Sequence, residues 1–120
     1  MEYTPHARKT ILIADDDVYV RSFIKALLER AGYKVIEAYD GQDAVEKFIE
    51  NREEIHLLVL DIMMPRKSGK DAYDEISKLQ PGIKALFVSG YAGDLMTDTD
   101  YLAKPFKASV LLNRLNGMFN

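Results

Sequence analysis

Acidic, hydroxyl and basic residues stand at the ends of separate apolar runs in this chain, and together they suit phosphoryl chemistry. Three aspartates, 15–17, follow the run TILIA, Asp61 follows HLLVL, and Ser89 and Lys104 end two later runs. Carboxylates held close together repel one another, and a hard oxygen-binding cation such as Mg²⁺ relieves that repulsion. A lysine and a hydroxyl can hold a phosphoryl group. The set is therefore suited to transferring a phosphoryl group onto an aspartate.

The elements that must position these residues alternate between two periodicities. Short apolar runs predict five strands, at 10–14, 33–38, 56–61, 83–90 and 101–103. Apolar residues at helical spacing predict four helices between and after them, marked by 24/27/28/31, 44/45/48/49, 72/76/79 and 111/115/118. Gly32 and Pro81-Gly82 are typical helix stops, and Asp40-Gly41 is typical of a turn. The segment 91–100 fits either a single helical turn or a loop.

Strands that alternate with helices predict a parallel sheet with helices on both faces. In such sheets, functional residues gather beyond the carboxyl ends of the strands. Asp61, Ser89, Lys104 and the aspartates at 15–17 all follow strand ends. The pattern therefore predicts that positions far apart in the sequence meet at one edge of the sheet. Asp17 is interpreted separately, as a residue at the N-terminus of the following helix, where a carboxylate is favourable.

Four motifs, ILIADDD, LLVLDIMMPRKSG, ALFVSG and YLAKPF, occur in order at these strand ends. With them the chain resembles the receiver domains of two-component response regulators. The resemblance covers residues 9–120 and leaves 1–8 as a flexible tail. It implies a flavodoxin-like, doubly wound α/β fold with a five-stranded parallel sheet in the order 2-1-3-4-5. The short spacing from Ser89 to Lys104 implies that the fourth helix of the family is shortened or missing, and VSGYAGDL…KPF is most similar to receivers of hybrid sensor histidine kinases.

The resemblance assigns roles to the acidic residues. Asp61 is expected to accept the phosphoryl group, and Asp15 and Asp16 are expected to form the acidic pair. The implied cofactor is Mg²⁺, held directly by Asp16, Asp61 and the backbone carbonyl of Met63. Asp15 is expected to contact the ion largely through water.

The remaining roles concern response and reset. Ser89 is implied as the switch hydroxyl, Lys104 as the cation that contacts the phosphoryl group, and Tyr101 as an aromatic that changes rotamer. The bond before Pro105 is cis in this family.

Receivers take the phosphoryl group from a histidine kinase or a histidine phosphotransfer protein, so these are the expected partners. The domain is expected to catalyse its own phosphorylation and slow dephosphorylation, and it is not an enzyme in the usual sense. In the family, the residues two after the acceptor and two after the switch hydroxyl tune loss of the phosphoryl group. These are Met63 and Tyr91, whose bulk predicts poor access for water and slow loss.

Two alternatives remain open at this point. The pattern ILIADDDVYV also fits the opening of haloacid-dehalogenase-like phosphatases, with Asp15 as nucleophile and Asp17 as acid–base. That family needs a late acidic pair, and no aspartate or glutamate follows Asp100. A flavin-binding module of the same fold is the other alternative. It needs a glycine- and hydroxyl-rich phosphate loop, where this chain has three aspartates.

Composition limits the partners further. The chain has 120 residues, 48% hydrophobic content and a net charge of −3, which suits one domain without a basic surface. It has no cysteine, so disulfides and thiolate chemistry are excluded. We therefore expect a cytoplasmic domain with no direct nucleic-acid contact and no membrane contact, present as a monomer or weak homodimer.

Overall fold

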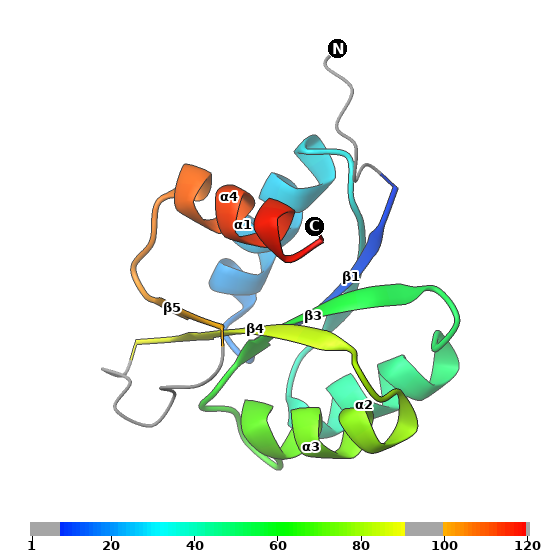
Figure 1. Ribbon diagram of the computed structural model, residues 1–120. Helices are drawn as coiled ribbons and strands as arrows, with labels where there is room; N and C mark the ends of the chain where they lie inside the picture. Colours follow the sequence, from blue (N-terminus) through cyan, green and yellow to red (C-terminus); the bar gives the residue numbers. More distant parts are fainter. Residues whose placement is uncertain (1–7, 91–99, 120) are drawn as a thin grey trace.

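Nine elements follow one another in the computed structural model, which describes residues 8–90 and 100–119 (Figure 1). The strands are β1 (Thr10–Ala14), β2 (Lys34–Ala38), β3 (Ile55–Asp61), β4 (Lys84–Ser89) and β5 (Tyr101–Ala103). The helices are α1 (Val18–Arg30), α2 (Gly41–Glu50), α3 (Gly69–Leu79) and α4 (Ala108–Met118). The predicted alternation of strands and helices is confirmed over these residues.

The strands form one parallel sheet in the order β2-β1-β3-β4-β5. This is the predicted doubly wound, flavodoxin-like order. The register pairs Ala14 with Leu60 and Asp61 with Val88, so the ends of β1, β3 and β4 lie next to one another. Ala103 pairs with Ser89, which brings the end of β5 to the same edge. The register thus gathers the residues that follow these strands.

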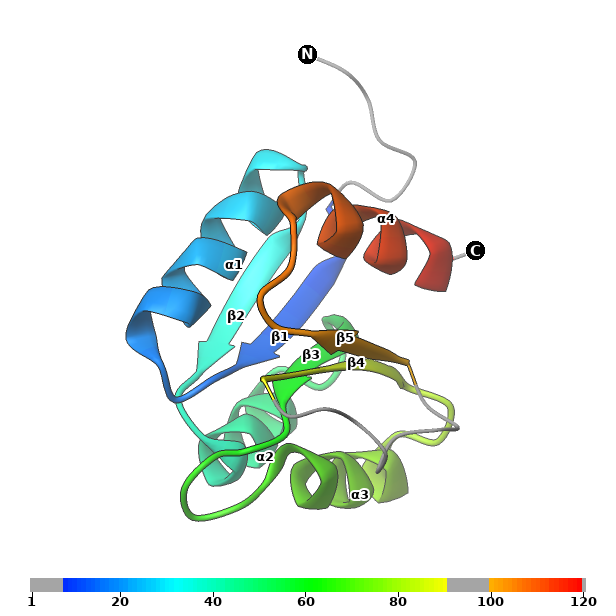
Figure 2. The same ribbon diagram turned by 90° about the vertical axis from the view of Figure 1, so that its left-hand side faces the viewer.

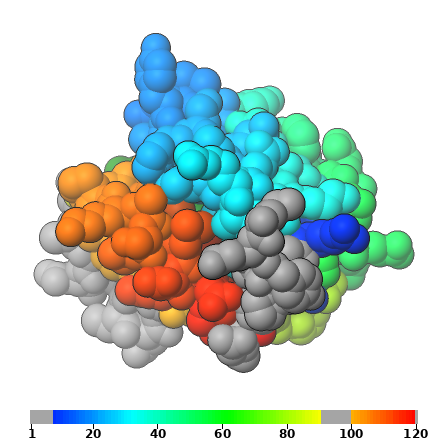
Figure 3. All heavy atoms as spheres, turned by 90° about the horizontal axis from the view of Figure 1, so that it is seen from above, coloured from blue at the N-terminus to red at the C-terminus, as the bar shows by residue number. Residues whose placement is uncertain are grey.

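The helices cover the two faces of the sheet in pairs, with α1 and α4 on one face and α2 and α3 on the other (Figures 1 and 2). Successive side chains of a strand point to opposite faces, and the core is divided accordingly. In β1, Ile11 and Ile13 pack toward α1 and α4, whereas Leu12 and Ala14 pack toward α2 and α3. All of β1 is buried, as predicted for a strand covered on both sides. Figure 3 shows α1, in blue to cyan, beside α4, in orange to red.

The ends of α1 follow from its sequence. Asp17 is its N-cap, and the carboxylate accepts hydrogen bonds from the backbone N–H groups of Tyr19 (2.9 Å) and Val20 (3.3 Å). Gly32 follows the helix at φ 99°, a left-handed conformation that glycine adopts without strain. Both the cap and the stop were predicted from the sequence.

The predicted strand limits at 33–38, 56–61 and 83–90 were wrong by one residue at an end. Tyr33 lies before β2 because its N–H bonds to the carbonyl of Leu28, and its ring stacks on Phe119 at 5.7 Å. Ile55 joins β3 by pairing with Thr10, and Ile83 closes a turn onto Gln80. Tertiary contacts therefore set these limits.

Two expectations concern segments outside the described residues. Residues 1–7 of the expected tail and 91–99, where a shortened or missing helix was expected, both lie there. Within the described part of the chain, no helix is long and apolar enough to cross a membrane.

Candidate phosphoacceptor site

The loop after β1 presents its first two aspartates differently. Asp15 is 1% exposed, and its carboxylate accepts a hydrogen bond of 2.9 Å from the N–H of Asp17. Asp16 is exposed. Arg21 in α1 reaches back to the carbonyl oxygen of Asp15 at 2.7 Å and also pairs with Glu37 of β2 at 3.2 Å. The turn is thus fixed from both its side-chain and its backbone oxygens.

Asp61, the last residue of β3, joins the first two aspartates at this edge. Carboxylate oxygens of Asp15, Asp16 and Asp61 all lie within 4.8 Å of one another. Asp61 is only 7% exposed. The sheet topology therefore holds three carboxylates together although 45 positions separate Asp16 from Asp61.

Lys104, just beyond β5, provides the positive charge. Its Nζ lies 2.9 Å from Asp15 Oδ2 and 3.6 Å from Asp61 Oδ2. Its N–H donates to the carbonyl of Ser89 at 2.8 Å, and the following bond to Pro105 is cis, as the family resemblance implied. One ammonium group therefore faces two buried carboxylates at once.

This arrangement changes how the groups titrate. Burial, with the negative charge of Asp15, raises the pKa of Asp61 to about 6, against the opposing effects of Lys104 and of a hydrogen bond from the Met63 N–H. Burial pulls the pKa of Lys104 down, but Asp15 and Asp61 outweigh it, so this pKa is raised. Lys104 thus stays charged, while the ionised form of Asp61 lacks full compensation.

Ser89 and Tyr101 lie beside this cluster. Ser89 ends β4 and is 1% exposed. Tyr101 begins β5 opposite Phe87, is half-buried, and its hydroxyl donates to the Ser89 carbonyl at 3.4 Å. The predicted switch pair is thus connected by a hydrogen bond, and both residues lie on the strands next to Asp61.

The loop after β3 brings Met63 to the site. Its backbone N–H donates to the Asp61 carboxylate, while its side chain is 61% exposed. Gly69, at the far end of the loop, donates its N–H to the Ile62 carbonyl at 3.0 Å. Tyr91, the other residue expected to tune phosphoryl loss, lies outside the described residues.

The donor set fits the implied magnesium ion. Three carboxylates converge without any histidine or cysteine, and hard cations such as Mg²⁺ prefer oxygen ligands of this kind. The raised pKa of Asp61 indicates that the cluster favours added positive charge. Asp16 is exposed, which leaves a side open to water and ligands.

Two contributors escaped sequence reasoning. Arg21 supports the Asp15 backbone, and Arg66 in the loop after β3 binds Asp40 at the start of α2. No local signal distinguishes them from other surface arginines. Gly69 stood out only as loop punctuation, yet a Cβ there would lie 2.1 Å from the Asp61 carbonyl oxygen. The signal that could have found it is a glycine directly after the helix-capping Ser68.

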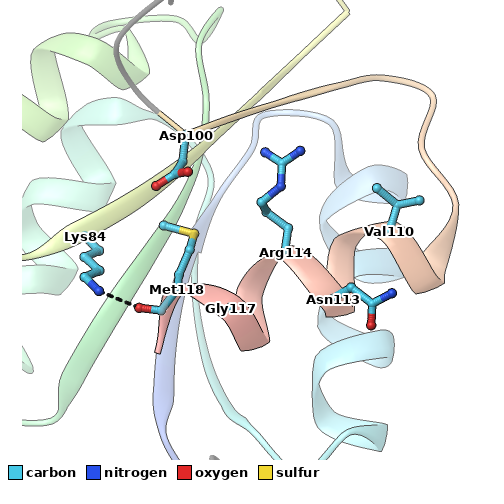
Figure 4. A pocket seen from close by; sticks show the side chains of 7 residues that line it. All are labelled: Lys84, Asp100, Val110, Asn113, Arg114, Gly117 and Met118. Atoms are coloured by element: carbon cyan, nitrogen blue, oxygen red, sulfur yellow. Dashed lines mark hydrogen bonds between the residues drawn. The ribbon is translucent and has the colours of Figure 1, made fainter. Parts of the chain in front are cut away.

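A pocket of about 630 Å³ lies apart from the carboxylate cluster (Figure 4). It is lined by β4, α4 and the start of the β5 segment: Lys84, Asp100, Val110, Asn113, Arg114, Gly117 and Met118. Lys84 donates to the Met118 carbonyl at 2.7 Å, and Arg114 donates to the Tyr101 carbonyl at 2.8 Å. None of the aspartates of the cluster lines it, so it is separate from the candidate site.

Comparison with known proteins agrees with this geometry. The model of the response regulator receiver domain family matches residues 11–116. The chain is 35% identical to the chemotaxis protein CheY of Thermotoga maritima, over 90% of this chain and 95% of that protein. It is 40% identical to response regulator RR06 of Streptococcus pneumoniae over 90% of this chain, but spans only 52% of RR06.

A solved structure gives the same result. The receiver domain of the hybrid histidine kinase CckA superposes with a TM-score of 0.83 at 32% identity, covering 92% of this chain and 99% of that one. The comparisons give no support to the phosphatase alternative, and Asp17, its required acid–base, caps α1 instead. With a family model that spans nearly the whole chain and a matching fold and carboxylate edge, this protein belongs to the response regulator receiver domain family.

Proposed function

We propose that this domain accepts a phosphoryl group from phosphohistidine onto Asp61. The observation that carries the proposal is the geometry around this carboxylate. Asp61 is buried, groups with Asp15 and Asp16 within 4.8 Å, and faces the Lys104 ammonium at 3.6 Å. A carboxylate with a pKa of about 6 is mostly ionised at neutral pH and can act as a nucleophile.

The proposed step is an in-line displacement. An Asp61 oxygen forms a bond to phosphorus while the bond from phosphorus to the donor's imidazole nitrogen breaks, and the electron pair returns to that nitrogen. Lys104 neutralises charge on the phosphoryl oxygens. Asp16, Asp61 and the Met63 carbonyl would hold Mg²⁺ directly and Asp15 through water; the bound ion supplies charge neutralisation for the incoming group.

The response is proposed to start at Ser89. Its hydroxyl would turn to a phosphoryl oxygen on Asp61, since β4 lies next to β3. The half-buried Tyr101, which donates to the Ser89 carbonyl, would then change rotamer. This is a two-state element biased by new charge.

The proposal includes slow loss of the phosphoryl group, catalysed by the domain itself. Met63 carries a large side chain, 61% exposed, directly beside the acceptor's loop. It has no acid or amide group to orient water, and neither does Tyr91. Decay of the phosphorylated form after removal of the donor measures this directly.

The partner is proposed to be a histidine kinase or a histidine phosphotransfer protein, docked on an apolar groove next to the site. The groove measures about 510 Å³ and is lined by Tyr19, Val20, Phe23, Lys104, Pro105 and Phe106. Lys104 belongs both to the groove and to the carboxylate cluster. Tyr19 is 84% exposed and Phe23 48%, which leaves apolar area for a partner's helix face.

Shortening the groove's aromatic side chains should separate partner transfer from chemistry. We expect Phe23→Ala to slow transfer from a phosphorylated phosphotransfer domain about tenfold, because buried aromatics dominate interface energies. Phosphorylation by acetyl phosphate should stay unchanged. Ile49→Ala, an exposed apolar residue of α2, is the matched control. Equal loss with both donors would reject this docking surface.

Three further expectations complete the proposal. Residues 9–120 form the working domain, and 1–8 form a tail. The domain acts as a monomer or weak homodimer, without direct contact to nucleic acid or membrane. The cytoplasm is its compartment, as suits a chain without cysteine.

Intact mass after incubation with acetyl phosphate tests the central claim. We expect wild type to gain one phosphoryl group only with Mg²⁺, and Asp61→Asn to gain none. Asp17→Asn, which retains a capping side chain outside the cluster, should behave as wild type. Labelling that survives in Asp61→Asn and disappears in Asp15→Asn would instead favour the phosphatase alternative.

A further inference from the structure

The loop that follows the acceptor is held at both ends by backbone hydrogen bonds. This acceptor loop, residues 62–68, starts with Ile62, whose N–H donates to the Val88 carbonyl at 3.2 Å. It ends where Gly69 donates back to Ile62 at 3.0 Å. Between these points Met63 donates its N–H to the Asp61 carboxylate. The position of the loop backbone therefore decides what Asp61 contacts.

The middle of the acceptor loop is attached to a different helix through Arg66. Its Nε lies 2.7 Å from Asp40 Oδ2, and its Nη2 lies 3.2 Å from Oδ1. Asp40 is 4% exposed, and the same Oδ1 caps α2 by accepting the Asp43 N–H at 2.7 Å. The guanidinium also lies 5.9 Å from the centre of the Tyr39 ring. A two-point contact with a buried carboxylate fixes orientation as well as distance.

The backbone of Arg66 shows that the loop is held in an unusual shape. Its φ is +65°, in the left-handed region that residues other than glycine adopt at an energetic cost. The surrounding structure must offset that cost. The ion pair with Asp40 is the printed side-chain contact that does so, because no hydrogen bond of another kind is assigned to this side chain.

A second attachment lies one residue further along each segment. A Cβ on Gly41 would lie 1.9 Å from the carbonyl oxygen of Lys67. The backbone of the acceptor loop therefore rests directly on the first residue of α2, next to the Asp40–Arg66 pair. Two adjacent contacts make the start of α2 a fixed support for the loop.

We propose that the Asp40–Arg66 ion pair positions the acceptor loop so that its backbone meets Asp61, and thereby sets Mg²⁺ affinity and the rate of phosphoryl acceptance. Neither residue touches the reacting atoms, so both are positioning residues. The proposal rests on the proposed function for its consequences at Asp61. Its structural part, that the pair restrains the loop, stands independently.

The test uses substitutions that spare the local backbone. Arg66→Asn removes the charge and tolerates a left-handed conformation, and Asp40→Asn removes the charge and still caps a helix. We expect each variant to speed amide exchange of Lys67 and Gly69 about tenfold in metal-free protein. We expect the Mg²⁺ dissociation constant to rise about three- to tenfold. The double variant should be no worse than either single one, since both remove the same interaction.

Lys47→Gln is the matched control, because Lys47 pairs with Asp43 in α2 at 3.1 Å and does not contact the acceptor loop in any printed hydrogen bond or ion pair. It should leave loop exchange and Mg²⁺ affinity unchanged. Additive effects of the two single variants would overturn the proposal, as would lower global stability with unchanged loop exchange.

The two levels of the proposal fail differently. If wild type neither binds Mg²⁺ nor accepts a phosphoryl group, the proposed function is wrong, whereas exchange in metal-free protein still judges the ion pair. If wild type does both and the loop amides of the Asn variants exchange as in wild type, the positioning role alone is wrong.

Discussion

In metal-free buffer at pH 7, Asp61→Asn raises the free energy of unfolding by up to about 3 kcal/mol. The reason is that burial and the charge of Asp15 raise the pKa of Asp61 to about 6 in the folded protein, against 3.8 for a free aspartate. The folded state therefore holds this proton more tightly than the unfolded chain does. Ionising Asp61 destabilises the fold, and an amide removes that penalty while keeping the shape.

The pH dependence has a defined sign. Below about pH 4 both states are protonated, so wild type and variant should differ little in this term. The difference grows between about pH 4 and 6 and is complete above pH 6. Urea unfolding at several pH values, with a chelator present, measures it.

Magnesium should reverse the order. Mg²⁺ binds the folded carboxylate cluster and stabilises wild type by mass action, and it should stabilise Asp61→Asn far less. Asp17→Asn, with its exposed capping carboxylate outside the cluster, is the control and should follow wild type throughout. A variant at Asp61 that is less stable than wild type in chelator at pH 7 would contradict the electrostatic account.

Gly69→Ala should lower the free energy of unfolding by about 3 kcal/mol or more and abolish Mg²⁺ binding. A Cβ at this position would lie 2.1 Å from the Asp61 carbonyl oxygen and 3.3 Å from the Ile62 Cα. Both neighbours are backbone atoms at the end of a buried strand, so no side chain can simply turn aside. The acceptor must shift, and its carboxylate shifts with it.

Gly117→Ala separates this steric effect from the general effect of replacing glycine. Gly117 lies in α4, and a Cβ there would meet nothing within 4 Å. Alanine favours helix over glycine by about 0.5–1 kcal/mol, so this variant should be stabilised. Urea unfolding and magnesium titration of both variants check the prediction. Full magnesium binding by Gly69→Ala would show that the close contact is not required.

Most of the fold could be predicted because its signals are local. The fully apolar β1 indicated a strand covered on both faces, and Ile24 and Leu28 at helical spacing indicated the buried side of α1. Asp17 and Gly32 marked the ends of that helix through cap chemistry that acts over a few residues. Strand limits were less predictable, since Tyr33 is drawn out of β2 by its contacts with Leu28 and Phe119.

The candidate site was predictable to the level of which residues meet. Parallel strands place their carboxyl ends at one edge, so Asp15, Asp61 and Lys104 had to approach one another once the strands were recognised. Their distances and burial were not predictable. Whether a carboxylate is 7% exposed, as Asp61 is, depends on the packing of several loops at once.

By itself, the sequence determined the alternation of elements, the sheet order through the resemblance, and the chemistry of the strand ends, because periodicity and motif lie along the chain. Only the tertiary structure decided how loops support one another: Arg21 on the Asp15 carbonyl, Arg66 on Asp40 across 26 positions, and Gly41 against Lys67. These contacts join segments whose separation is set by packing of the whole domain. A long side chain such as arginine can reach many partners, and its local sequence does not select among them.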